Sequence, residues 1–141
     1  MPRPGAQTRP AGAAEATAYL AKAREFLRAA KDSLELANNT AAVGNAVHAG
    51  ILAADAIAAL RSRMVWRGEH SQATSHLELA GEDGKQAARH FRRLLPLKTR
   101  AEYDPTPIRA VDAKAAVTAA ERMVAIAAQA VSSAPAPKKM R

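Results

Sequence analysis

Apolar residues recur every three or four positions along most of the chain, which is the spacing of helices that bury one face. In residues 14–37, Tyr19, Phe26 and Leu34 share one face, and charged residues fill the opposite face. Similar segments predict four further helices, over residues 40–66, 71–80, 85 into the stretch KTRAEYD at 98–104, and 108–132. No segment alternates with a period of two, so no sheet is predicted. The pattern therefore predicts an all-α fold, an antiparallel up-down bundle of four to five helices.

Polar and helix-breaking residues separate these segments. The breaks are NNT at 38–40, RGEHS at 67–71, GEDG at 81–84 and DPTP at 104–107. Pro96 falls near the end of the fourth segment, where it is expected to kink the helix or to start a new turn. Asp104 precedes a proline and is expected to cap the turn into the last helix.

The second segment is apolar on nearly every side until Arg61, which is typical of a central, buried helix. Gly44, Gly50 and many alanines would let neighbouring helices approach it closely. Its length would also suit a membrane span. However, Asp55 in its middle would cost about 2.5–3.5 kcal/mol in a bilayer. We therefore expect the core helix of a soluble bundle, without membrane association.

Length, composition and charge indicate the domain organisation and the location of the protein. The 141 residues are enough for one domain, which we place at residues 13–132 between disordered basic tails at 1–12 and 133–141. The net charge is +8, and the tails carry most of the excess. Basic tails suit nucleic acid or acidic surfaces, although solubility alone explains them equally well. The chain has no cysteine and no apolar leader, which favours a cytoplasmic location.

Several kinds of site have no sequence signature here. The chain contains no phosphate-binding loop of the GxxxxGK[ST] type, no GxGxxG and no HExxH. Its histidines are not spaced as helix-facing metal pairs, and they are His48, His70, His76 and His90. Neither a metal site nor a cofactor is predicted.

The apolar second segment carries a polar stripe formed by Asn45, His48 and Asp55. A buried carboxylate without a partner is costly, so Asp55 should meet a cation from another segment. Arg100 is the first choice and Lys98 the second. The stripe either registers two helices against each other or lines a pocket or a dimer seam.

The stretch KTRAEYD places further polar residues opposite this stripe. Besides Lys98 and Arg100, it supplies the phenol of Tyr103, which is expected near His48. These residues, together with Asp104, form the predicted internal polar network.

Arginines gather on the fourth segment. Arg89, Arg92 and Arg93 stand at i, i+3 and i+4 and are predicted to form one basic face. Arginine suits phosphate because its planar guanidinium can bond two oxygens at once. The alternative is a solvated helix face without a ligand.

Five stretches together resemble HEPN domains, most closely the small actinobacterial type. They are AYLAKAREFLRAAKDSLE (18–35), NAVHAGILAADAIAAL (45–60), GEHSQATSHLELA (68–80), RRLLPLKTRAEYDPTP (92–107) and an alanine-rich last helix. The resemblance covers roughly residues 18–131. It implies a helical bundle that forms a homodimer and binds RNA or nucleotide, often within a toxin–antitoxin or defence system. A cognate nucleotidyltransferase-like or antitoxin protein would then be a partner.

Catalytic HEPN members are metal-independent ribonucleases with an Arg-x(4–6)-His motif. Arg63 and His70 fit this spacing, although chance alone would supply such a pair. In that role His70 would act as general acid or base, and Arg63 would stabilise charge on the phosphorus centre. Gln72 stands two residues after His70, where catalytic members often carry tyrosine. Three functions thus stay open: RNA or nucleotide binding, endoribonuclease activity, and a structural or adaptor role.

Overall fold

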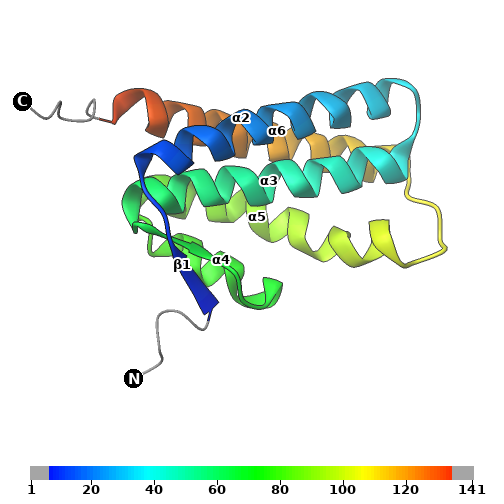
Figure 1. Ribbon diagram of the computed structural model, residues 1–141. Helices are drawn as coiled ribbons and strands as arrows, with labels where there is room; N and C mark the ends of the chain where they lie inside the picture. The colour runs from blue at the N-terminus through cyan, green and yellow to red at the C-terminus, as the bar shows by residue number, and fades with distance from the viewer. Residues whose placement is uncertain (1–6, 135–141) are drawn as a thin grey trace, which may run out of the picture.

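The computed structural model describes residues 7–134, which form five α-helices and two short β-strands (Figure 1). In chain order the elements are β1 (Thr8–Pro10), α2 (Ala13–Glu35), α3 (Asn39–Arg61), β2 (Met64–Trp66), α4 (His70–Glu78), α5 (Gly81–Glu102) and α6 (Ala110–Ser133). The predicted all-α helical bundle is confirmed. The two strands were not predicted.

The four long helices α2, α3, α5 and α6 run alternately up and down beside one another (Figure 1). Helix α3 is central, because it packs against α2, α5 and α6. The short helix α4 packs mainly on α5, at the end of the bundle where the chain passes from α3 to α5. This end also holds the two strands, so several connections meet there.

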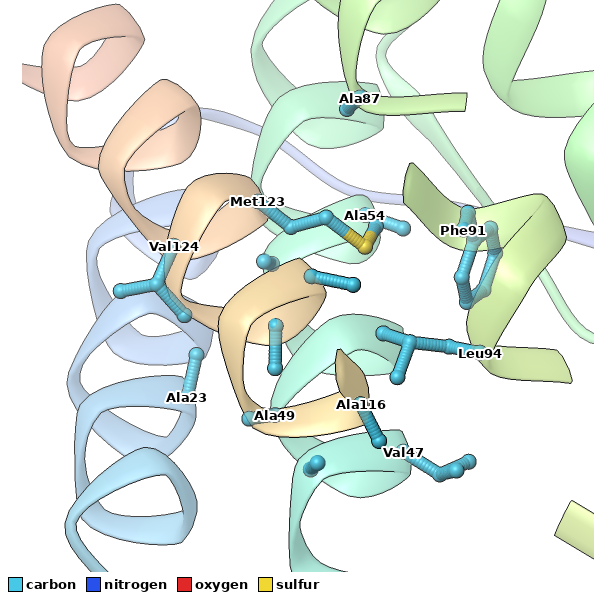
Figure 2. Packing of buried hydrophobic residues seen from close by; sticks show 14 of the residues in the cluster. Ala23, Val47, Ala49, Ala54, Ala87, Phe91, Leu94, Ala116, Met123 and Val124 are labelled. Carbon is cyan, nitrogen blue, oxygen red and sulfur yellow. The ribbon is translucent and has the colours of Figure 1, made fainter. Parts of the chain in front are cut away.

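Small side chains form much of the core, and a few larger ones fill the spaces between helices (Figure 2). Leu94 and Phe91 of α5 and Met123 of α6 point toward α3. Gly50 of α3 makes this approach possible, since a Cβ there would lie 2.6 Å from Leu94 Cδ1. By contrast, a Cβ on Gly44 would meet nothing within 4 Å. The expectation that glycine allows close approach therefore holds at Gly50 only.

Helix α3 is the one helix in residues 7–134 that is long and apolar enough to cross a membrane. In the bundle, however, 67% of its most apolar window is buried against the other helices. Its apolar surface is therefore used inside the fold, as expected of the core helix of a soluble protein.

Helix α3 ends at Arg61, five residues before the predicted end at Trp66. Arg63 adopts a φ of 58°, in the left-handed region, and this reverses the chain. Met64–Trp66 then pairs antiparallel with Thr8–Pro10, with Arg9 opposite Val65. The prediction of a disordered tail over residues 1–12 is therefore wrong for this strand. Residues 1–6 and 135–141 of the predicted tails lie outside the described residues.

Pro96 does not end α5, which continues as one helix to Glu102. Proline lacks the N–H that would bond the carbonyl one turn earlier, on Arg92. Pro96 and Arg92 are both exposed, so water can satisfy the carbonyl that is left without its helical partner.

Candidate functional site

Asp55 is the most deeply buried charged group in the described residues, with 6% of its surface exposed. Its carboxylate accepts hydrogen bonds from Arg67 Nη1, at 3.3 Å to Oδ1 and 3.2 Å to Oδ2. The prediction of a cationic partner from another segment is confirmed. The choice of Arg100 or Lys98 as that partner is wrong, because the chain reversal after α3 brings Arg67 back over the helix.

Further polar residues hold Arg67 in place. Its Nη1 also donates to the backbone oxygen of Trp66 at 2.7 Å, and its Nη2 donates to the Tyr19 hydroxyl at 3.2 Å. Arg9 of β1 donates to the same hydroxyl at 2.8 Å. The guanidinium of Arg67 also lies over the Tyr19 ring, 5.9 Å from its centroid. Strand β1, α2 and α3 are thus joined around one buried carboxylate.

Burial raises the pKa of Asp55 from 3.8 to about 6, because the interior solvates a carboxylate poorly. The charge and hydrogen bond of Arg67 oppose this effect, as does the charge of Arg9. Desolvation is the larger influence, so ionised Asp55 is costly to hold in the fold even with its arginine partner.

The other residues of the predicted polar network do not gather at Asp55. Lys98 Nζ bonds Glu102 Oε2 at 3.0 Å within α5. Arg100 lies 4.0 Å from Asp112 on α6. Lys98 and Arg100 are therefore held in contacts away from Asp55.

Three members of that network meet around Glu102 of α5 instead. The hydrogen bond and charge of Lys98, a hydrogen bond with Tyr103 and the nearby His48 all lower the pKa of this carboxyl. The ring of His48 packs on Phe26 of α2, with centroids 5.1 Å apart. Tyr103 is 77% exposed, and Asn45 is half-buried on α3. The backbone N–H of Thr106 donates to Asp104 Oδ1 at 2.8 Å and lowers the pKa of that carboxyl. The prediction that Asp104 caps the turn into the last helix is confirmed.

Arg63 and His70, the predicted catalytic pair, occupy different settings. Arg63 is the left-handed residue between α3 and β2, and its backbone oxygen accepts the Ala11 N–H at 3.1 Å. His70 begins α4 and lines a cavity whose described lining does not include Arg63. No hydrogen bond or ring contact joins the two side chains within residues 7–134, so the geometry does not by itself favour a catalytic pair in one copy of the chain.

A second hollow lies between α5 and α6, with a volume of about 350 Å³; we call it the α5–α6 groove. Its lining residues are His90, Arg93, Leu97, Val111, Lys114, Ala115, Ala116, Thr118, Ala119 and Arg122. The cations Arg93, Lys114 and Arg122 are exposed, and none of them forms an ion pair within the described part of the chain. The groove therefore combines uncompensated positive charge from two helices with an apolar floor.

His90 lies among these cations, and their charge affects its pKa. Partial burial lowers its pKa, and the positive charges of Arg122, Arg93 and Arg89 lower it further. His90 is therefore neutral at pH 7 and can serve as a hydrogen-bonding group between the arginines.

The predicted basic face is only partly present. Arg92 turns toward α4, where its Nη2 lies 2.6 Å from Glu78 Oε2. The unpaired face instead joins Arg89 and Arg93 of α5 to Lys114 and Arg122 of α6. Lys114 and Arg122 were missed by sequence reasoning, although their spacing of eight residues places them on one side of the last helix.

Among residues 7–134, no group of three or more His, Asp or Glu side chains is placed to hold a metal ion. No protein-family model matches the sequence, and no curated protein is found to be similar to it.

Proposed function

We propose that the chain is a HEPN-like helical protein of the cytoplasm that binds RNA or nucleotide through the α5–α6 groove. The observation that carries this proposal is the set of unpaired cations that two neighbouring helices present along one hollow. Phosphate is the ligand that such a set suits, because guanidinium groups donate two hydrogen bonds to it and release counterions on binding.

The shape of the groove supports a nucleic-acid strand more than a free anion. Arg93 and Arg122 come from opposite walls, so successive phosphates could be held on both sides of the floor. Leu97 and the 63% exposed Val111 add apolar surface to the lining, against which a sugar or a base could pack. Neutral His90 adds a hydrogen-bonding group between the cations.

The resemblance to HEPN domains adds the partners in this proposal. A homodimer would double the number of grooves, and a cognate nucleotidyltransferase-like or antitoxin protein would regulate access to them. A molecular mass measured by light scattering at micromolar concentration tests the dimer, and the mass of a monomer would contradict it.

The groove is tested by binding of a fluorescein-labelled single-stranded RNA, followed by anisotropy. The variant Arg93→Ala/Arg122→Ala removes one cation from each wall. The matched control is Arg24→Ala/Arg28→Ala on α2, which removes two exposed arginines that have no ion pair among residues 7–134. We expect the groove variant to bind at least about tenfold more weakly than wild type and the control to stay close to wild type. Equal losses in the two variants would contradict the proposal.

Endoribonuclease activity, the second candidate function, needs a separate experiment. Mapping of RNA ends in cells that express wild type or His70→Ala distinguishes cleavage from binding alone. Identical profiles in the two strains leave RNA or nucleotide binding as the function, and cleavage lost with His70 would assign catalysis to that residue. If the anisotropy experiment detects no RNA binding by wild type, a structural or adaptor role takes the place of the proposal.

A further inference from the structure

A cavity of about 410 Å³ opens between α3, α4, α5 and the segment after β2, away from the α5–α6 groove. We call it the Trp66 cavity. Its walls are mostly apolar, with Ile51 from α3, Leu77 from α4 and Phe91 from α5. Its volume is within the range of small-molecule sites, which are typically about 300–1,000 Å³. Apolar walls with a few polar groups are also typical of such sites.

Trp66 forms a rigid wall of this cavity. Its Nε1 donates to the backbone oxygen of Glu69 at 2.9 Å, and its ring packs on His76 with centroids 5.3 Å apart. Gly68 lets the ring lie close to the backbone, because a Cβ there would come within 2.5 Å of Trp66 Cζ2. The indole is therefore fixed before any ligand arrives, which lowers the entropy cost of binding a flat ring against it.

The polar part of the cavity is the pair of Asp55 and Arg67, and this pair has spare hydrogen-bonding capacity. A single nitrogen, Arg67 Nη1, donates hydrogen bonds to both carboxylate oxygens, at 3.2 and 3.3 Å. These bonds are longer than the roughly 2.7–2.9 Å usual for charged partners. Each oxygen of Asp55 has a second lone pair. The hydrogen bonds that Arg67 makes leave its Nε–H and one Nη2 hydrogen unused among the described residues.

An adjacent acceptor and donor of this kind match the edge of an amide, which offers N–H beside C=O. The pair is neutral as a whole, so an uncharged ligand leaves no charge uncompensated, whereas a cation or an anion would. His76 also favours a ligand that carries hydrogen-bond donors. Its ring makes a hydrogen bond with the backbone of Met64, while its Nε2 is buried without a hydrogen-bond partner among the described residues. This nitrogen can therefore accept a hydrogen bond from a ligand.

We propose that the Trp66 cavity binds an uncharged flat ring that carries a carboxamide or lactam edge. The amide N–H donates to the Asp55 carboxylate, the amide oxygen accepts from Arg67, and the ring lies against Trp66 and Phe91. This site does not depend on the proposed RNA binding, because it shares no lining residue with the α5–α6 groove.

Four ligands that share a phenyl ring test the proposal on the full-length protein. Benzamide has both halves of the amide edge, N,N-dimethylbenzamide lacks the donors, benzoate is an anion and benzamidine is a cation. The readout is the indole Nε1–H resonance in ¹⁵N-labelled protein, which is a single signal because Trp66 is the only tryptophan in the sequence. We expect benzamide to shift this signal and to bind about tenfold more tightly than each of the other three.

Two variants connect this preference to named residues. Ala73→Leu fills the cavity from α4 and should weaken all four ligands. Asp55→Asn replaces the carboxylate with an uncharged amide, whose single oxygen is a weaker acceptor, and should reduce the preference for benzamide over N,N-dimethylbenzamide. If Asp55→Asn does not fold, the ligand series on wild type still decides. Equal binding of benzamide and its dimethyl analogue, or no shift of the Trp66 signal with benzamide, would overturn the proposal.

Discussion

Replacing Asp55 with asparagine should change how the stability of the fold depends on pH. Burial raises the pKa of this carboxyl to about 6 in the folded state, against an ordinary value of 3.8. The folded protein therefore binds the Asp55 proton more tightly than the unfolded chain does. The stabilisation given by that proton is complete below about pH 4 and is lost as the pH rises through about 6.

The magnitude follows from the two pKa values. Each pH unit between them contributes about 1.4 kcal/mol to the free energy of unfolding, which gives about 3 kcal/mol in total for Asp55. Asp55→Asn does not titrate. The free energy of unfolding of the variant minus that of wild type should thus rise by about 2.4 kcal/mol from pH 4 to pH 7, because part of the total is already lost at pH 4.

Urea denaturation followed by circular dichroism at several pH values measures this difference. A constant offset between variant and wild type reports only how well the asparagine amide fits beside Arg67, so the change with pH is the diagnostic quantity. Asp32→Asn, at an exposed position on α2, is the matched control for loss of a carboxylate. A constant difference from pH 4 to pH 7 would refute the reasoning. If Arg67, and not burial, dominates the pKa, the difference should instead fall as the pH rises toward about 4 and stay nearly constant above it.

Two pairs of variants test the packing and the ion pairs. Gly84→Ala should destabilise the fold by about 2 kcal/mol or more in urea denaturation, because its Cβ would lie 2.1 Å from the Leu77 backbone oxygen. Gly44→Ala should be neutral or stabilising by up to about 1 kcal/mol, since space is open there and alanine favours helix; equal losses at the two glycines would contradict the packing. Arg67→Met should lower the free energy of unfolding at pH 7 by about 2 kcal/mol because it leaves a buried carboxylate unpaired. Arg100→Ala breaks only a 4.0 Å contact between half-buried groups and should cost less than about 1 kcal/mol; a larger loss at Arg100 would contradict the assignment of Arg67 as the buried partner.

The helical bundle could be predicted from the sequence because its signal is local. The spacing of Phe26 and Leu34 on α2, and the apolar run of α3, each indicate a helix without knowledge of its neighbours. The ends of the helices were harder to place. No residue between Arg61 and Trp66 is a glycine or a proline, so nothing in this stretch signalled the left-handed turn at Arg63.

The misplaced end of α3 also explains why the wrong partner was predicted for Asp55. On a continuous helix, residues 55 and 67 would lie about 18 Å apart along the axis, which is too far for a salt bridge. The reversal at Arg63 and the pairing of β2 with β1 bring Arg67 back to the carboxylate. The need for a cation was visible in the sequence, because burial of a lone carboxylate is costly anywhere. Its identity depended on a turn that the pattern did not reveal.

The α5–α6 groove depends on tertiary packing in the same way. The arginines of α5 were recognised as a basic face, but Arg92 is neutralised by Glu78 of α4. Lys114 and Arg122 join the face only because α6 packs beside α5. Sequence spacing shows which residues share one side of a helix, but it does not show which helices place those sides together.

The central claim is that unpaired cations of the α5–α6 groove bind phosphates, and its most direct test is the salt dependence of RNA affinity. For single-stranded RNA, each phosphate contact contributes about 0.7 to the slope of log Kobs against log salt concentration. Arg93→Ala/Arg122→Ala should therefore reduce the magnitude of the slope by about 1.4, while Arg24→Ala/Arg28→Ala leaves it unchanged. A slope that is the same in wild type and the groove variant would contradict the claim.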